Sequence, residues 1–221
     1  MSTYVLMRIL ESAPHRYELG MRILTLGRLD RAYDDLASHI EADQRVLDIG
    51  CGTGALTVRA ARRGATVKAI DVNAQMLEVA VRRLKESGHE ERVELAEMGV
   101  AELDQEEAGS FDVVMSGLCF SELSDDEVAY TLKEVGRILK PGGLVLVADE
   151  VRPRGLVRRW VHFLLRLPLV IVTYLVTQQT THAVSHLIEK LSTAGFAIES
   201  QRLSPLHSFV RVVARKPGTA S

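Results

Sequence analysis

The sequence has 221 residues, of which 47% are hydrophobic and 25% are charged, and its formal net charge at pH 7 is −2. This length favours a single elaborated domain, and the composition is ordinary for a globular protein. The near-neutral charge lacks the overall positive field of nucleic-acid-binding proteins, so we expect no nucleic-acid partner.

The N-terminal residues and the cysteines both bear on the cellular setting. Arg8 and Glu11 interrupt the first apolar run, and no small-residue cleavage motif follows, so we expect no signal peptide. Two cysteines, Cys51 and Cys119, are too few for a disulfide framework. We therefore predict a reduced, cytoplasmic localisation.

Along the chain, residues 1–40 are predicted to form an N-terminal helical cap, because Leu, Ile and Met recur there at helical spacing. From residue 45 to residue 149, short apolar runs alternate with amphipathic segments. The predicted strands lie in RVLDIG, TVKAIDV, RVELAEM, SFDVVMS and LVLVADE, and the predicted helices in ALTVRAARRG, NAQMLEVAVRRLKESG and DDEVAYTLKEVGRILKPGG. Apolar strands joined by helical crossovers predict parallel pairing.

Helix boundaries are marked by particular residues in this core. Asn73 is a predicted N-cap and Gly88 a predicted C-terminal stop for the helix between them. Pro141 and the two glycines after it are predicted to end the last of the three helices.

The remaining residues form two further segments. Residues 151–181 are an apolar insertion, and residues 182–216 are predicted to form a helix from His182 to Ala194 and two strands joined by a turn around Pro205. The whole chain, 1–221, is thus predicted to be one α/β domain. Its core is a Rossmann-like open sheet, mostly parallel, with a C-terminal antiparallel hairpin, N-terminal helices and a helical insertion after strand five.

The insertion contains the most apolar run of the chain, Leu156–Gln178. Three arginines and Pro168 interrupt it, and the uninterrupted part is too short to cross a bilayer. Its place directly after strand five predicts a lid over the substrate site. A pair of core helices and shallow docking on a membrane surface remain alternatives.

Two sequence features point to one ligand site. VLDIGCGTG places Gly50, Gly52 and Gly54 between a strand and a helix, where glycine lets a ligand approach the main chain. A tight turn would explain the triplet equally well, and its spacing differs from the dinucleotide fingerprint. Asp71 ends the second strand, where a carboxylate can accept both hydroxyls of a ribose.

Residues 45–149 resemble the class I S-adenosylmethionine-dependent methyltransferases. The resemblance rests on VLDIGCGTG, on AIDVN after the second strand, on FDVVMSGL in the fourth and on LKPGGLVLVADE in the fifth. It implies S-adenosylmethionine as the methyl donor and a reversed last strand, which the predicted hairpin matches. The cofactor-binding residues it implies are Tyr17, Asp48, Gly50, Cys51, Gly52, Gly54, Asp71, Val72, Met76, Val100, Ala101 and Ser116.

The resemblance also implies roles for these residues. Asp48 and the three glycines would surround the methionine moiety, and Asp71 would bind the ribose. Val72 and Met76 would pack against the adenine.

The adenine edge would be read next to Ala101. Many family members have an acidic residue just before this alanine, where the present sequence has Val100. Backbone groups or Glu102 would then read the adenine. Tyr17 lies in SAPHRYELG, which resembles a segment that precedes the first strand in quinone-type members of the family. This resemblance implies that Tyr17 closes over the cofactor.

A second resemblance, over the whole length, is to the corrinoid-protein-associated methyltransferases of anaerobic bacteria. It rests on YVLMRILESAPHRYELG, MSGLCFSELSDDEVAYTLKEVGRILKPGG and PLVIVTYLVTQ. It implies a corrinoid or a corrinoid protein as substrate or partner, and it offers no catalytic residue to transfer.

Candidates for acid–base or covalent chemistry are few. Cys119 follows strand four, but methyl transfer needs no enzyme nucleophile, so we expect it to pack as a small buried side chain. Glu122 and Glu150 lie at strand ends, where solvated or capping roles are equally suitable. We therefore assign no catalytic residue.

The histidines do not form a clear metal motif. His182 and His186 are four residues apart, with Glu189 three further on, which is a spacing that a metal site can use. A third ligand motif is missing, so a polar helix face is expected and no metal is predicted. His162 and His207 carry no assignment.

The favoured function is methyl transfer to a small-molecule or cofactor acceptor, which includes a corrinoid. Transfer to a lipid or quinone-like acceptor is one alternative, and a non-catalytic regulator that binds S-adenosylmethionine is another. A ribosomal or nucleic-acid target is disfavoured, because strand four is followed by SGLC rather than an N-P-P-Y-like motif. Membrane contact is expected to be peripheral at most, and the oligomeric state is left open.

Overall fold

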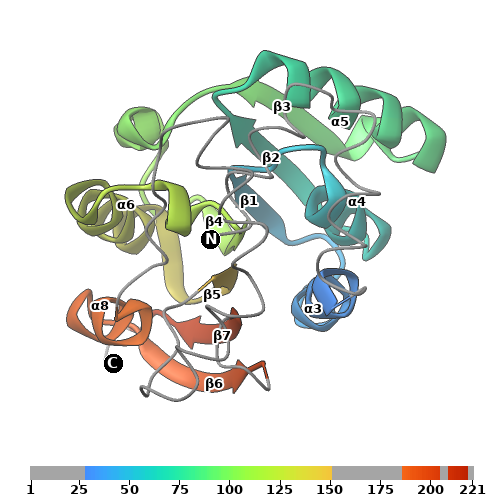
Figure 1. Cartoon of the computed structure of the whole chain (residues 1–221). Helices are drawn as coiled ribbons and strands as arrows, with labels where there is room; N and C mark the ends of the chain where they lie inside the picture. The colour runs from blue at the N-terminus through green and yellow to red at the C-terminus, as the bar shows by residue number, and fades with distance from the viewer. Residues whose placement is uncertain (1–27, 151–185, 205–208, 219–221) are drawn as a thin grey trace, which may run out of the picture.

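One seven-stranded sheet organises this computed structural model, in which residues 28–150, 186–204 and 209–218 are described (Figure 1). The strand order is β3-β2-β1-β4-β5-β7-β6. The first five strands pair in parallel, whereas β7 is antiparallel to both β5 and β6. This confirms the predicted open sheet with its antiparallel hairpin. The strands are β1 Arg45–Ile49, β2 Thr66–Asp71, β3 Val93–Glu97, β4 Phe111–Gly117, β5 Leu139–Glu150, β6 Ala197–Leu203 and β7 Phe209–Arg215.

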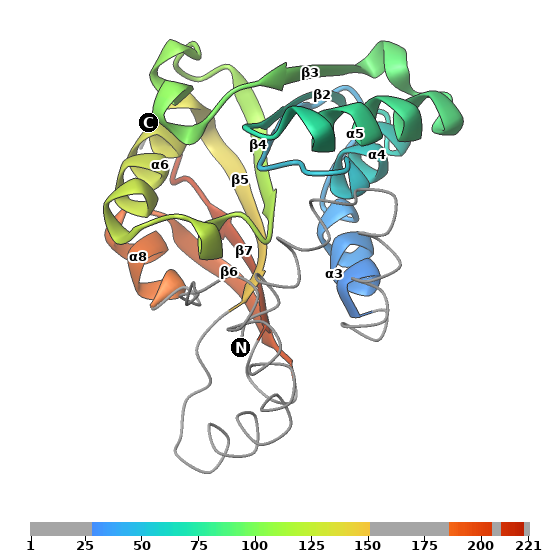
Figure 2. The same ribbon diagram turned by 45° about the horizontal axis from the view of Figure 1, so that its top comes forward.

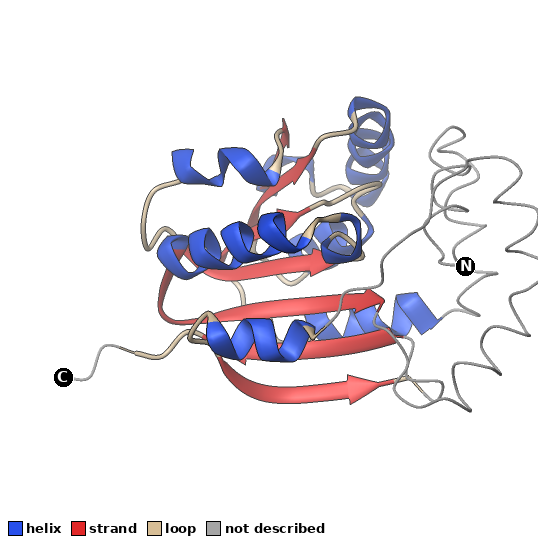
Figure 3. Ribbon diagram, turned by 60° about the vertical axis from the view of Figure 1, so that its left-hand side comes forward, coloured by secondary structure: helices blue, strands red, loops and turns tan. Residues whose placement is uncertain are grey.

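Helices cover both faces of the sheet (Figures 2 and 3). α3, α4 and α5 lie on one face, and α6 and α8 lie on the other. Because both faces are covered, the central strands are apolar without alternation, as the sequence pattern predicted. The α-helices are α3 Arg28–Ala37, α4 Ala55–Arg62, α5 Ala74–Ser87, α6 Asp125–Ile138 and α8 Leu187–Thr193, and the short 3₁₀ helices are η1 Glu90–Arg92, η2 Val100–Gln105 and η3 Phe120–Glu122.

The ends of α5 are those that the sequence predicted. The Asn73 side chain accepts hydrogen bonds from the backbone N–H groups of Gln75 and Met76, at 3.0 and 3.3 Å. Gly88 follows the helix with a φ of 69°, in the left-handed region that favours glycine. These two caps fix where α5 begins, and therefore how the chain leaves β2.

The boundary between α6 and β5 lies earlier than the sequence predicted. α6 ends at Ile138, and Leu139 already has an extended backbone. A residue directly before proline is disfavoured in the helical region, so Lys140 cannot continue the helix into Pro141. The predicted strand LVLVADE is the second part of a longer strand, whose register against β4 shifts between Phe111 and Val113.

The C-terminal hairpin places β7 inside the sheet and β6 at its edge. Val210 and Val212 of β7 are buried, whereas β6 is largely exposed. The predicted turn at Pro205 and the predicted start of the last helix at His182 lie outside the described residues, within which α8 begins at Leu187.

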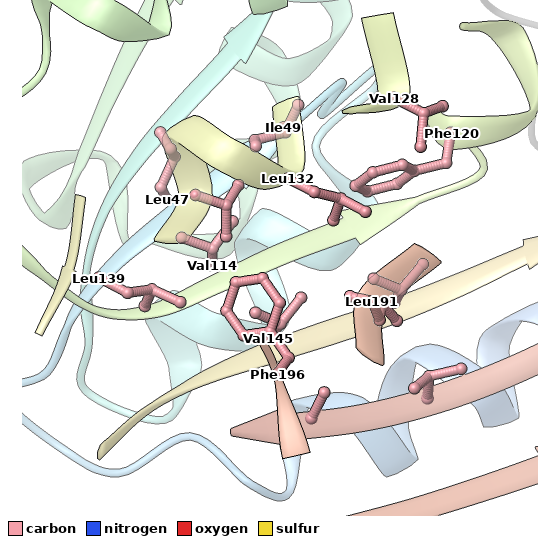
Figure 4. Close-up of a cluster of buried hydrophobic side chains, with 14 of the residues drawn as sticks. Leu47, Ile49, Val114, Phe120, Val128, Leu132, Leu139, Val145, Leu191 and Phe196 are labelled. Carbon is pink, nitrogen blue, oxygen red and sulfur yellow. The ribbon is translucent and has the colours of Figure 1, made fainter. Parts of the chain in front are cut away.

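The hydrophobic core lies on both faces of the central strands. On the face covered by α6 and α8, Leu132, Leu191 and Phe196 pack against strand residues that include Val114 and Val145 (Figure 4). Truncating one such side chain to alanine typically costs about 2–5 kcal/mol. The core thus holds β1, β4 and β5 rigidly and fixes the position of the loops at their carboxyl ends.

Several predicted segments lie outside the described residues. They are the cap residues up to 27 and the whole of the insertion at 151–181, so the lid remains a prediction. Of the helices that are described, none combines the length and the apolar character needed to cross a membrane.

Candidate active site

A cavity of about 1170 Å³ opens at the carboxyl ends of β1, β2 and β4. This is the point where the sheet order reverses, with β2 on one side of β1 and β4 on the other, and open α/β sheets bind their ligands there. The ends of these three strands and the loops after them supply much of the lining, and the remainder comes from α3, α4 and α5, from residues 98–101 after β3 and from Glu127 of α6.

The loop after β1 is held tightly against β2. The backbone N–H groups of Gly50 and Cys51 both donate to the carbonyl oxygen of Ile70, at 2.9 and 3.0 Å. Gly50 has a φ of 67°, and a Cβ built on it would lie 2.5 Å from the Cβ of Cys119. Gly52 has a φ of 53° and would meet no atom within 4 Å. Gly50 is therefore required by packing, whereas Gly52 faces space that a ligand can fill.

Asp71 links this loop to the end of β2. Its Oδ2 accepts the backbone N–H of Gly52 at 2.7 Å, and its Oδ1 accepts that of Asn73 at 2.8 Å. A carboxylate offers about four acceptor positions. Backbone N–H groups use at least two of these positions, so Asp71 keeps capacity to accept a donor from the cavity, such as a ribose hydroxyl. Burial raises the pKa of Asp71, and the backbone hydrogen bonds oppose that rise.

Asp48 is a buried carboxylate beneath the loop. Its Oδ2 accepts the Thr57 hydroxyl at 2.6 Å, and its Oδ1 has no hydrogen-bond partner within the described part of the chain. Burial raises the pKa of Asp48 to about 7, Thr57 lowers it, and the charge of Asp71 raises it. Because an unsatisfied buried oxygen is costly, Oδ1 fits a donor carried by a ligand, such as an amine.

The β2 side of the cavity carries an apolar surface. Val72 is 73% exposed in this structure, and Met76 is buried beside it in the cavity wall. Val100 and Ala101, at the start of η2, line the same side. A flat aromatic group bound here would remove Val72 from water, which is favourable.

Glu102 does not line this cavity. Its Oε2 accepts the backbone N–H of Gly99 at 2.8 Å and so caps η2. Residues 99–101, by contrast, do line the cavity, and which groups read the adenine stays a prediction.

On the β4 side, a strained turn borders the cavity. Leu118 has a φ of 67°, which is uncommon for any residue other than glycine. Its backbone N–H donates to the carbonyl oxygen of Ala148 at 2.8 Å. Cys119 follows and contacts Gly50. Burial, followed by the charges of Glu122 and other carboxylates, raises the pKa of the Cys119 thiol well above its usual value. A protonated thiol is a poor nucleophile, in agreement with a packing role.

The structure brings most of the predicted cofactor-binding residues together. Those that line the cavity are Asp48, Gly50, Cys51, Gly52, Asp71, Val72, Met76, Val100 and Ala101. Tyr17 and the side chain of Glu150 lie outside the described residues.

Two of the predicted residues, Gly54 and Ser116, are not among those that line the cavity. A Cβ on Gly54 would lie 3.1 Å from that of Ala80, so this glycine serves the packing of α4 on α5. Ser116 is buried, and its hydroxyl donates to the carbonyl oxygen of Ile49 at 2.9 Å, which joins β4 to β1.

Sequence reasoning missed cavity residues that come from the helices. Tyr33 of α3, Arg59 of α4 and Arg83 of α5 all line the cavity, and an Arg83 N–H donates to the Thr53 hydroxyl at 3.2 Å. In the sequence, the only local feature that marked any of them was the occurrence of Tyr33 at an apolar position of a helix. An aromatic residue at such a position is found in the core as well as in binding sites, so it does not identify a site residue.

The pair formed by His186, which directly precedes α8, and Glu189 of α8 is not part of the cavity lining. His186 Nδ1 is 2.6 Å from Glu189 Oε2. Across residues 28–150, 186–204 and 209–218, no group of three or more His, Cys, Asp or Glu side chains is placed to hold a metal ion. His182, His162 and His207 lie outside these ranges.

The fold and site together define a class of protein. The resemblance to class I methyltransferases implied three features of this fold and site. The structure has all three: a parallel sheet with a reversed last strand, a glycine loop after β1 and a carboxylate after β2. In agreement, residues 46–143 match a family model described as a methyltransferase domain. Residues 46–143 are therefore similar to methyltransferase domains, and the fold agrees with the resemblance to the class I S-adenosylmethionine-dependent methyltransferases.

Individual relatives support this assignment. A ubiquinone/menaquinone biosynthesis C-methyltransferase, UbiE, from Hahella chejuensis is 30% identical over 151 residues, which is 66% of this chain and 59% of the relative. The chain thus spans less than two thirds of that curated relative.

Solved structures show the same fold. A SAM-dependent methyltransferase from Methanosarcina mazei has a TM-score of 0.65 at 21% identity, covering 82% of this chain and 96% of that one. Geranyl diphosphate C-methyltransferase from Streptomyces coelicolor, in complex with geranyl diphosphate and S-adenosyl-L-homocysteine, has a TM-score of 0.65 at 17% identity, covering 91% and 84%. The predicted corrinoid acceptor and corrinoid-protein partner remain predictions.

Proposed function

We propose that this chain binds S-adenosylmethionine in the cavity and transfers its methyl group to a quinone-like aromatic acceptor. The observation that carries the donor half is the position of Asp71, which holds the glycine loop and lines the cavity with a carboxylate that can accept a ribose hydroxyl. The acceptor half rests on the relative from Hahella chejuensis, which is described as a ubiquinone/menaquinone C-methyltransferase.

Each part of the donor has a matching group in the cavity. Asp71 accepts the two ribose hydroxyls, and Val72 packs against the adenine, whose edge meets the backbone of residues 99–101. Asp48 Oδ1, for which the described residues offer no hydrogen-bond partner, accepts a hydrogen bond from the amino group of the methionine moiety. Gly52 lets the donor lie directly against the main chain.

The residues then act by orientation and exclusion of water. When bound, S-adenosylmethionine supplies an electrophilic methyl group, and its sulfur keeps the electron pair of the broken S–CH₃ bond. The acceptor carbon forms the new bond and then releases its proton to solvent. The rigid loops after β1 and β4 align the two reactants, and alignment of this kind can supply several kcal/mol. Cys119 takes no covalent part, because its thiol is protonated.

The β4 side of the cavity suits a flat apolar acceptor. Gly117, Leu118, Cys119 and Leu123 line it and are small or apolar, and the carboxylates Glu122 and Glu127 line the cavity beside them. An aromatic ring would bind the small and apolar part of this surface through burial of apolar area.

The proposal is tested with purified protein, S-adenosylmethionine and a short-chain demethylmenaquinol. We expect S-adenosylhomocysteine and a product carrying one additional methyl group, both measured by mass spectrometry. Donor binding without product would overturn the quinone-like acceptor while keeping the donor site. The absence of donor binding in calorimetry would overturn both. The Asp71→Ala variant, which has lost the ribose acceptor, is the matched negative control.

A further inference from the structure

Tyr33 extends from α3 to the carboxyl end of β4. Its side chain is 7% exposed and lines the same cavity as the glycine loop. A Cβ built on Gly117 would lie 2.3 Å from the Tyr33 hydroxyl oxygen and 2.6 Å from its Cζ. The hydroxyl therefore lies directly against the last residue of β4.

Gly117 is glycine for a steric reason. Its φ is outside the left-handed region, so its backbone conformation does not require glycine. The absent side chain leaves the volume that the Tyr33 hydroxyl fills. These two residues are 84 positions apart in the sequence, and together they place a phenol at the end of β4.

A second contact fixes the orientation of Tyr33. The Arg59 guanidinium carbon lies 5.8 Å from the centroid of the Tyr33 ring. Arg59 also bonds Asp34 through Nε at 2.6 Å and Asp30 through Nη2 at 3.0 Å. Both aspartates belong to α3 and flank Tyr33, so Arg59 ties α3 to α4 and restricts the ring. A side chain held in this way is preorganised for contact with a ligand.

The position of the hydroxyl separates it from the donor groups. Asp71 and Val72 lie at the end of β2, on one side of β1, whereas Gly117 ends β4 on the other side. The contact between Gly50 and Cys119 joins the two loops, so the β4 side continues the cavity beyond the glycine loop. Tyr33 is thus placed where an acceptor would meet the donor.

We propose that Tyr33 is an acceptor-site residue whose hydroxyl donates a hydrogen bond to an oxygen next to the methylated carbon. This inference rests on the proposed function. A hydroquinone-type acceptor carries such oxygens on its ring, and its ring carbon becomes a better nucleophile as the adjacent oxygen gains negative charge. A fixed phenol beside that oxygen stabilises the charge, as donors in an oxyanion hole do. The site would then select acceptors with an oxygen adjacent to the reacting carbon.

The test compares Tyr33→Phe with wild type, using a short-chain demethylmenaquinol as the acceptor. We expect kcat/KM for the acceptor to fall by about 100-fold, the usual loss for one removed donor of this kind. The affinity for S-adenosylhomocysteine, measured by calorimetry, should change by less than about twofold, since Tyr33 lies on the acceptor side. Unchanged kcat/KM would overturn the proposal, and so would a loss explained by weaker donor binding.

Tyr130→Phe is the matched control. Tyr130 is half-buried on α6 and does not line the cavity, although its hydroxyl donates to the Ala101 carbonyl at 3.2 Å. Its kcat/KM for the acceptor should stay within about threefold of wild type. A loss equal to that of Tyr33→Phe would overturn a specific role for Tyr33.

A second measurement decides the case in which wild type binds the donor but does not methylate this probe. That outcome would remove the quinone-like acceptor, and Tyr33 is then tested with S-adenosylmethionine labelled with ¹³C at its methyl group. If the hydroxyl faces the transfer position, the bound methyl resonance will differ between wild type and Tyr33→Phe but not between wild type and Tyr130→Phe. Identical resonances in all three proteins would overturn the placement of Tyr33.

Discussion

The backbone N–H of Gly52 donates to Oδ2 of Asp71 over 2.7 Å, and this bond joins the loop after β1 to the end of β2. The same carboxylate therefore shapes the loop and faces the ligand. Changes at either residue should affect donor binding, but for different physical reasons.

Replacing Asp71 by alanine removes the acceptor for the ribose and for Gly52. We expect the affinity for S-adenosylhomocysteine to fall by at least tenfold, because donors on ligand and loop lose their partner. Asp112→Asn is the control, since Asp112 also bonds a backbone N–H, that of Arg45 at 2.9 Å, but does not line the cavity. Calorimetry showing equal affinities in all three proteins would remove Asp71 from the site.

Alanine at Gly50 and at Gly52 should have different consequences. Gly50→Ala combines a φ of 67° with a 2.5 Å clash against Cys119, so we expect a loss of about 1–3 kcal/mol of unfolding free energy. Gly52→Ala has a strained φ of 53° but no clash, and its methyl group enters ligand space. It should weaken donor binding more than it lowers stability. Thermal unfolding measures the stability of both variants, and calorimetry measures their affinity for the donor. A larger stability loss in Gly52→Ala, or a larger affinity loss in Gly50→Ala, would contradict the prediction.

The stability of the ligand-free protein should depend on the titration of Asp48. Its pKa is raised by burial from 3.8 to about 7, so the folded state binds this proton more tightly than the unfolded state. The stabilising contribution is complete below about pH 4 and is lost as pH rises through 7. A shift of this size corresponds to a few kcal/mol, on the order of 1.4 kcal/mol per pH unit.

Asp48→Asn isolates this effect, because asparagine keeps an acceptor for Thr57 and does not titrate. We expect the unfolding free energy of wild type, relative to Asp48→Asn, to fall between pH 4 and pH 8. Chemical denaturation at several pH values measures the difference. A difference that stays constant over this range would show that Asp48 is ionised throughout.

The cavity thiols should react slowly with alkylating agents. Burial is the largest of the effects that raise the pKa of both Cys51 and Cys119 well above the usual value. Alkylation requires the thiolate, so a raised pKa slows the reaction. At pH 8 we expect iodoacetamide to modify both residues at least tenfold more slowly in the folded protein than in urea, as followed by mass spectrometry of peptides. Equal rates in the two conditions would show that the thiols are ionised in the cavity.

The sequence alone determined the order of elements and the donor loop. Alternating apolar runs and amphipathic segments predicted the five parallel strands, because hydrophobic periodicity reports local structure. Asn73 and Gly88 predicted the ends of α5, because capping depends on a residue and its near neighbours. The glycine loop and Asp71 were predicted as one site, because the carboxyl ends of parallel strands meet at one edge.

The tertiary structure decided what depends on residues distant in the sequence. It placed Gly54 against Ala80 and bonded Ser116 to Ile49, outside the cavity lining, and among the described residues it gave Asp48 Oδ1 no partner. It also brought Tyr33 against Gly117, although neither residue carries a local signal of the other. Periodicity shows which face of an element is buried, but only packing in three dimensions determines which side chain occupies the space that a distant glycine leaves.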